Sequence, residues 1–96
     1  MNSNLDVELD WDEANVRHLA RHKITREEVE EFFANDPTFV DYEIVNGEDR
    51  WTALCATNEL RVLFVVFTMR GERIRPVSGW DADRLTEEDY FRSRGW

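Results

Sequence analysis

The sequence predicts an α+β fold, in which two N-terminal helices on one face and a short C-terminal helix accompany an antiparallel sheet of four to five strands. Three observations predict it. Two segments near the N-terminus carry helix-start signals, residues 38–57 have strand periodicity on both sides of an Asn-Gly turn, and residues 61–80 have the pattern of a hairpin around Gly71. Because short turns join the last four strands, we expect them to form a meander.

The size and charge of the chain limit its organisation and its partners. Ninety-six residues with 42% apolar composition predict a single domain spanning residues 1–96. No apolar run approaches the roughly 20 residues of a membrane helix, so we expect a cytoplasmic protein without a membrane partner. A net charge of −9 argues against nonspecific binding to nucleic acid, although residues 70–96 hold six basic and six acidic side chains and are neutral.

The N-terminal region predicts a strand followed by a helix. Residues 5–11 alternate apolar and acidic side chains, as a strand with one face on the core does. Either Asp10 or Asp12 caps a helix over residues 12–22, with Glu13 as the reciprocal partner of Asp10. The apolar side of this helix consists of Val16, Leu19 and Ala20.

A second helix is predicted over residues 26–35. Thr25 is its N-cap, Glu28 stands at the third helical position, and Ile24 is placed to pack on the first apolar residue of the helix. The residues expected to face the sheet are Val29, Phe32 and Phe33.

The remaining strands are predicted at residues 38–45, 50–57, 61–69 and 73–80. In the first of them, alternation places Val40, Tyr42 and Ile44 on one face and Phe39, Asp41 and Glu43 on the other. The run 61–69 is apolar throughout and is expected in the middle of the sheet. Pro76 has no amide hydrogen, so the last strand is expected at an edge or with a bulge there.

The C-terminal helix contains Leu85, Tyr90 and Phe91. Its N-terminus is capped either by Thr86, with Asp89 as the reciprocal residue, or by Asp81 further upstream.

Two residue types that bind metals give only weak signals. His18 and His22 are four apart on one helical face, but no third ligand stands at a companion spacing. Cys55 lies in an apolar strand and is interpreted as a small core residue. We therefore predict no metal and no cofactor.

The arginines of the predicted strands are the main candidates for a binding site. Arg50, Arg61, Arg73 and Arg75 stand on or beside three strands of the meander. On one exposed face they would bind phosphate. The alternative is that each pairs with one of the 21 carboxylates.

Metal-independent RNA cleavage needs a base, a cation for the phosphorane and an acid for the leaving oxygen. The candidates are His22 as base, Arg75 with Arg50 as cations, and Tyr90 or Glu88 as acid. Spacing alone does not bring these residues together.

Several short stretches of the chain resemble the BrnT family. They are residues 9–13 with Asn15, residues 20–25 leading into Glu27–Val29, residues 50–54, residues 63–67, residues 73–75 with Ser78, and Glu88 with Tyr90. The resemblance covers nearly the whole chain.

The resemblance implies a RelE-like fold and a type II toxin, an endoribonuclease that needs no cofactor and is inhibited by a cognate antitoxin. Three features depart from the family pattern. Lys23 replaces a glycine, Trp80 replaces an arginine, and the C-terminal segment is rich in Asp and Glu. The loss of the arginine at position 80 and the acidic C-terminal segment weaken the case for binding RNA phosphates.

Two hypotheses follow, a ribonuclease toxin or a non-catalytic BrnT-like module that binds a protein partner. The partners considered are a small antitoxin, RNA and a second copy of the chain. Trp80 bears on the choice. By alternation it lies opposite Arg75, in the core, whereas a bulge at Pro76 would bring it to the arginine side. We expect Trp80 to be partly exposed at a partner-binding surface.

Overall fold

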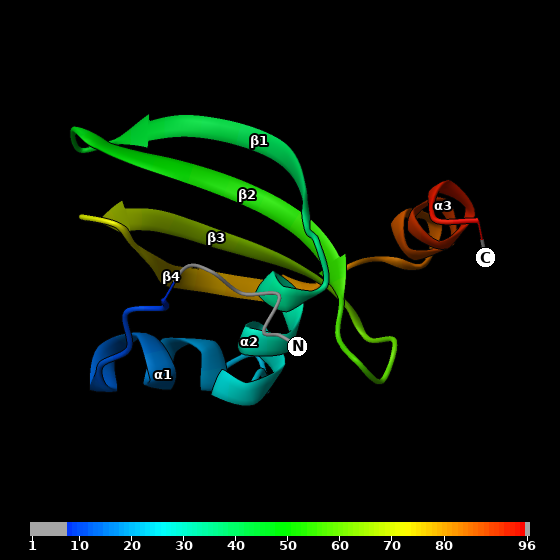
Figure 1. Ribbon diagram of the computed structural model, residues 1–96, viewed down its shortest axis with the longest axis horizontal. Helices are drawn as coiled ribbons and strands as arrows, with labels where there is room; N and C mark the ends of the chain where they lie inside the picture. The colour runs from blue at the N-terminus through cyan, green and yellow to red at the C-terminus, as the bar shows by residue number, and fades with distance from the viewer. Residues whose placement is uncertain (1–7, 96) are drawn as a thin grey trace.

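The computed structural model describes residues 8–95. Its elements are α1 (Glu13–Ala20), α2 (Arg26–Ala34), β1 (Thr38–Val45), β2 (Glu48–Ala56), β3 (Val62–Arg70), β4 (Arg73–Asp81) and α3 (Arg84–Ser93). The strands form one antiparallel sheet in the order β1-β2-β3-β4. The α+β class and the meander are therefore confirmed (Figure 1). None of the helices among residues 8–95 is long and apolar enough to cross a bilayer.

The predicted first strand is only partly within the described residues. Residues 5–7 of the predicted strand lie outside the described residues. The described part makes one parallel bridge, between Leu9 and Ile74 of β4. The Asp10 N–H donates to the Ile74 carbonyl at 2.7 Å, and the Ile74 N–H donates to the Glu8 carbonyl at 2.9 Å. Within residues 8–95, this segment contributes a bridge to β4 and no further antiparallel strand.

Helix α1 presents a different side to the sheet from the one predicted. Asp12 is its N-cap and accepts the Asn15 N–H, while the Asn15 side chain accepts the Asp12 N–H. Asn15 and Leu19, four residues apart, are the buried residues of the helix. Val16 is 37% exposed, so its predicted core position is wrong. The reason is that a polar residue, Asn15, occupies the inward position by bonding to buried backbone.

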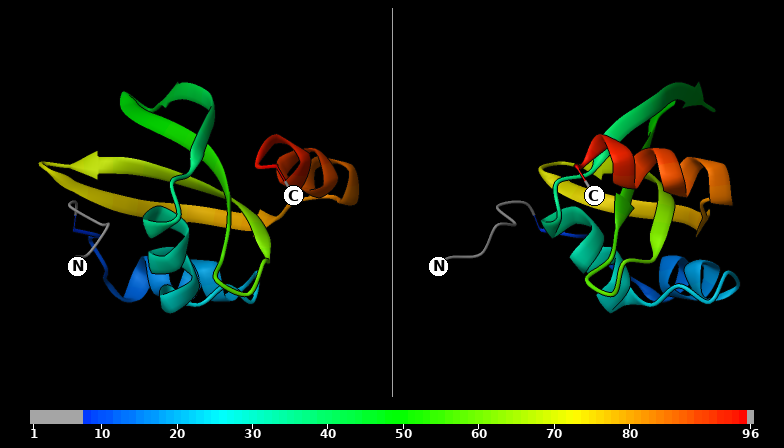
Figure 2. Two further views of the ribbon diagram at one scale, coloured as in Figure 1. Left: turned by 45° about the vertical axis from the view of Figure 1, so that its right-hand side comes forward. Right: turned by 90° about the vertical axis from the view of Figure 1, so that its right-hand side faces the viewer.

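Helix α2 follows the prediction closely. Thr25 and Glu28 form the expected capping box. Val29 and Phe32 have no exposed surface, and Phe33 is buried beside them. Together α1 and α2 lie side by side on one face of the sheet (Figures 1 and 2). They bury the larger core, whose strand residues are Ala53, Cys55, Leu63, Val65 and Phe67.

Close packing of the two helices on β4 depends on Gly79. A Cβ atom at this position would lie 3.0 Å from the Phe64 carbonyl oxygen and 3.2 Å from the methyl carbons of both Ile24 and Leu19. A side chain at this position would therefore require these neighbours to shift by a few tenths of an ångström.

Helix α3 packs at one end of the opposite face of the sheet. Leu54, Ala56 and Val62, which alternate with the residues of the larger core, form a second cluster with Tyr90. The N-cap of α3 is Asp83, whose carboxylate accepts the Thr86 N–H at 2.8 Å. Both caps considered from the sequence, Thr86 and Asp81, are therefore wrong.

Two bulges change which residues share a face. The β3–β4 register shifts between Val66 and Phe67, opposite Pro76, as predicted, and β4 is an edge strand of the four-stranded sheet. A second shift lies in β1 between Phe39 and Asp41. It puts Phe39 on the same face as Tyr42 and Ile44, which corrects the simple alternation expected for this strand.

Candidate functional site

A row of polar residues crosses the sheet on the face that α1 and α2 do not cover. Thr68 of β3 pairs with Arg75 of β4. The β2–β3 register, in which Trp51 pairs with Phe67, brings Arg50 level with Thr68 from the other side. The two arginines thus flank one threonine on three adjacent strands, and the predicted grouping of Arg50 with Arg75 agrees with this register.

This row forms part of a hollow that residues of α1 border at the β4 edge of the sheet. Its volume is about 340 Å³. The lining residues are Ala14, Asn15, His18, Glu48, Arg50, Thr68, Arg70, Arg75, Pro76 and Val77. The volume falls within the usual size range of small-ligand sites. Three guanidinium groups, one carboxylate and one imidazole therefore share a single concave surface.

The arginines of the hollow are held by carboxylates. The Arg75 side chain, only 13% exposed, lies 2.9 Å from an Asp12 oxygen and 3.6 Å from an Asp10 oxygen. The N–H of Asn15 and, after it, the Arg75 guanidinium lower the pKa of Asp12. Arg50 pairs with Glu48 at 2.8 Å. A phosphate that enters the hollow therefore competes with carboxylates for these arginines.

The β3–β4 hairpin carries two arginines at the end of the sheet, Arg70, which lines the hollow, and Arg73, which does not. Arg70 pairs with Arg73 in the strand register. Arg73 is 58% exposed at the side chain and makes an ion pair with Glu8 at 3.3 Å. The Arg70 side chain lines the hollow and has no ion pair or hydrogen bond with any of residues 8–95. Arg70 is therefore a cation available to an anionic ligand.

The two histidines of α1 differ in position. His18 lines the hollow, whereas His22, the base suggested by the sequence, is exposed past the end of the helix. Their ring centroids are 6.5 Å apart. His22 lies at the Asp81 end of β4, where its backbone carbonyl accepts a hydrogen bond from Arg61. The structure thus brings His18, rather than His22, beside Arg50 and Arg75.

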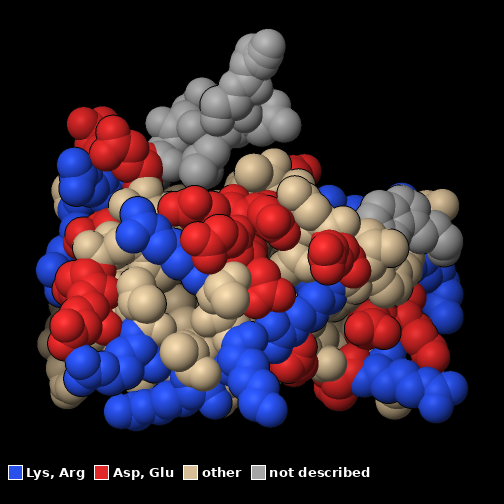
Figure 3. Space-filling model, turned by 90° about the horizontal axis from the view of Figure 1, so that it is seen from below, with Lys and Arg blue, Asp and Glu red and all other residues tan. Residues whose placement is uncertain are grey.

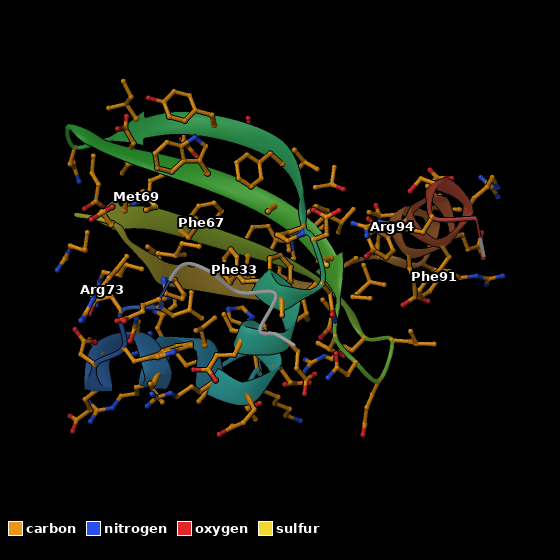
Figure 4. The ribbon with its side chains drawn as sticks, viewed as in Figure 1. Phe33, Phe67, Met69, Arg73, Phe91 and Arg94 are labelled. Carbon is orange, nitrogen blue, oxygen red and sulfur yellow. The ribbon has the colours of Figure 1, made fainter. Side chains whose placement is uncertain are left out.

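Neither acid suggested by the sequence lines the hollow. Tyr90 is buried, and its hydroxyl accepts the Ala56 N–H at 3.1 Å and lies 3.5 Å from the Cys55 sulfur. Burial raises the pKa of Tyr90, and burial likewise raises that of the Cys55 thiol. Glu88 is exposed on α3 and pairs with Arg84 at 3.1 Å. Figure 4 shows α3, with Phe91 and Arg94, at the opposite end of the sheet from Arg73.

Arg61 does not join the other arginines. Its guanidinium bonds to Asp81 at 2.7 Å, to Glu28 at 2.9 Å and to the Lys23 carbonyl at 2.8 Å. The Asp81 hydrogen bonds are the main cause that raises the pKa of Arg61. Arg61 therefore joins α2 and the α1–α2 connection to the end of β4.

Trp80 lies on the arginine side of the sheet. The bulge in β4 at Val77, next to Pro76, reverses the simple alternation, and Trp80 pairs with Phe64, which shares a face with Thr68. The indole stacks on the Phe64 ring with centroids 5.5 Å apart and is 40% exposed. The predicted partial exposure is confirmed, while the partner-binding role of Trp80 stays a prediction.

Charge is unevenly distributed over the surface. On the face formed by α1 and α2, seen in Figure 3, acidic side chains gather in the upper middle and Lys and Arg follow the lower margin. Among residues 8–95, no group of three or more His, Cys, Asp or Glu side chains is arranged to hold a metal ion.

Sequence reasoning missed His18, Thr68 and Arg70 as members of the site. Thr68 and Arg70 could have been found from the register of the β3–β4 hairpin. A turn after Arg70 sets Arg70 opposite Arg73 and Thr68 opposite Arg75. No comparable signal existed for His18, since its position depends on how α1 packs against β4.

Comparison with known proteins gives a single informative result. Residues 11–85, most of the chain and all of the hollow, match the family model of "Ribonuclease toxin, BrnT, of type II toxin-antitoxin system". No curated protein matches the sequence.

Proposed function

Because the chain belongs to the BrnT family of type II ribonuclease toxins, we propose that it cleaves RNA in the arginine-lined hollow and that a cognate antitoxin inhibits it in the cytoplasm. The observation that carries the proposal is the row formed by Arg50, Thr68 and Arg75 beside His18. Two guanidinium groups that flank Thr68 from β2 and β4, the two neighbours of β3, suit the binding of one phosphate group.

The cleavage that these residues support is attack of the RNA 2′-hydroxyl on the adjacent phosphorus. Glu48 accepts the proton of the 2′-hydroxyl, and the imidazolium of His18 donates a proton to the departing 5′-oxygen. Arg50 and Arg75 stabilise the additional negative charge of the phosphorane. The products are a 2′,3′-cyclic phosphate and a free 5′-hydroxyl, and no metal ion takes part.

Substrate binding in this scheme begins with an exchange of partners. RNA phosphate takes the place of Asp12 at Arg75 and frees Glu48 from Arg50. Arg70, which needs no such exchange with a described residue, receives a flanking phosphate. We therefore expect salt to inhibit RNA binding and cleavage strongly, since each phosphate contact releases counterions.

The test is cleavage of a fluorescently labelled single-stranded RNA by the purified chain in EDTA. Arg50→Ala and His18→Ala are each expected to lower the rate by about 100-fold, the usual effect of removing one catalytic contact. Arg92→Ala, which removes an exposed arginine on α3, is the matched control and is expected to cleave at the wild-type rate. Equal rates for all variants, with folding confirmed by circular dichroism, would refute the hollow as the active site.

A second candidate function, a non-catalytic binding module, is favoured by one observation. Arg50 and Arg75 both have carboxylate partners, so two of the three guanidinium groups that line the hollow are neutralised. In that case, the wild-type chain binds its antitoxin and leaves RNA intact at every salt concentration.

A further inference from the structure

The outer strand β1 carries an exposed apolar stripe. We use this name for Phe39, Tyr42 and Ile44, which are 63%, 50% and 64% exposed. The bulge at Val40 brings all three to the face on which α1 and α2 lie. Exposed apolar residues that are contiguous in this way mark interaction surfaces more often than isolated ones do.

The apolar stripe continues into the core through a series of aromatic rings. Tyr42 contacts Trp51 at 5.5 Å between centroids, Trp51 stacks on Phe67 at 5.8 Å, and Phe67 meets Phe33 of α2 at 5.2 Å. Phe39 also contacts Phe67, at 5.7 Å. Figure 4 shows Phe33 and Phe67 where the helical layer ends, with β1 and β2 extending beyond it. The helices therefore cover this face of the sheet at its β4 edge and leave it exposed at its β1 edge.

The uncovered area has the dimensions of one helix. Two strands about 4.8 Å apart present a band roughly 10 Å wide, which matches the diameter of an α-helix. From Phe39 to Ile44 the stripe is about 17 Å long, or about three helical turns. The Asp41 side chain accepts the Tyr42 N–H at 2.9 Å. The Tyr42 N–H of β1 thus already has an acceptor. This favours a partner that packs on the face of the sheet rather than one that adds a strand at its edge.

Charge indicates what kind of helix fits. Of the four acidic side chains in residues 38–50, Asp49, which pairs with Ile44, lies on the face of the stripe, and the whole chain has a charge of −9. A second copy would bring the acidic hairpins together, and like charges in such proximity are unfavourable. A helix with an apolar side flanked by Lys and Arg matches the stripe, Asp49 beside it and the negative charge of the chain.

We propose that the apolar stripe is the docking site for a basic amphipathic helix of the antitoxin, on the sheet face opposite the arginine-lined hollow. The identity of the partner rests on the proposed function. The location does not, because it follows from the exposure, extent and charge of β1 and β2.

The test measures binding of the purified antitoxin, the product of the reading frame next to the gene for this chain, by isothermal titration calorimetry. Phe39→Ser and Ile44→Ser are each expected to weaken binding at least tenfold, as removal of a central apolar contact does. Leu85→Ser, at a 72% exposed position on α3, is the matched control and is expected to bind like the wild type. All three positions are exposed, so the fold should be preserved.

Wild-type affinity in both stripe variants, or no binding by the unmodified chain, would overturn the proposal. Stripe-dependent dimers of the chain alone in sedimentation equilibrium would overturn it too, by assigning the stripe to a second copy. RNA cleavage is followed separately. Stripe-dependent binding by a chain that does not cleave RNA would reject the nuclease and support the docking site.

Discussion

The Asn15 side-chain amide donates a hydrogen bond to the Pro76 carbonyl oxygen at 3.1 Å. It also donates to the Asp10 carbonyl at 2.9 Å, while its oxygen caps the start of α1. One buried side chain therefore fixes α1 against the bulged part of β4. The position of His18 in the hollow and that of Asp12 beside Arg75 depend on this attachment.

Asn15→Ala is expected to lower the free energy of unfolding by about 2–4 kcal/mol, because it leaves two backbone carbonyls near α1 without their donor and removes a capping interaction. Urea titration followed by circular dichroism measures the change. Asn58→Ala, which removes one exposed side-chain contact, is the control and is expected to cost under about 1 kcal/mol. A loss that small at Asn15 would contradict its role in attaching α1.

Tyr90→Phe separates stability from activity. Loss of the hydroxyl leaves the buried Ala56 N–H without its acceptor, so the free energy of unfolding is expected to fall by about 1–3 kcal/mol. The RNA cleavage rate, measured well below the melting temperature, is expected to stay at the wild-type value because Tyr90 does not line the hollow. A large rate loss in the folded variant would instead restore Tyr90 as the acid suggested by the sequence.

Acid should destabilise the fold partly through Asp81. Hydrogen bonds from Arg61 lower the pKa of Asp81 below its usual 3.8. A lowered pKa in the folded state gives stability that is present above about pH 4 and is lost as the pH falls through the folded value. In urea titrations between pH 2 and pH 6, Asp81→Asn is expected to show a shallower loss of stability below about pH 4 than the wild type. Asp89→Asn, which breaks an exposed pair with Arg92, serves as the control. Identical slopes for wild type and Asp81→Asn would contradict the prediction.

Trp80→Arg tests the position of the indole. Since Trp80 is 40% exposed, an arginine keeps its charge in water and mainly loses the stacking on Phe64. We expect a cost of about 1–2 kcal/mol in the free energy of unfolding, measured by urea titration. A cost above about 4 kcal/mol would indicate a buried position, because it would require burial of an unpaired charge.

Local signals predicted most of the fold. The capping box of Thr25 and Glu28 set the start of α2, and the Asn46–Gly47 turn, in which both residues have positive φ, set the β1–β2 hairpin. The apolar run of β3 indicated an inner strand, and β3 does lie between β2 and β4.

The rest depended on contacts between distant segments. Val16 was assigned to the core because apolarity alone cannot show that Asn15 finds buried backbone partners. The site was only partly predictable for the same reason. Arg50 and Arg75 could be grouped from strand register, whereas the choice of His18 over His22 and the removal of Arg61 from the set needed the docking of α1 and α2.

The meander also bears on how the chain reaches its native state. Every pair of neighbouring strands is consecutive in sequence, so each pairing closes a short loop at a small cost in conformational entropy. The bridge between Leu9 and Ile74 joins opposite ends of the chain and closes a far longer loop. Topologies dominated by local pairings fold fast. The hairpins are therefore expected to form early. The N-terminal segment, whose Asp10 and Asp12 pair with Arg75 of the hollow, is expected to dock last.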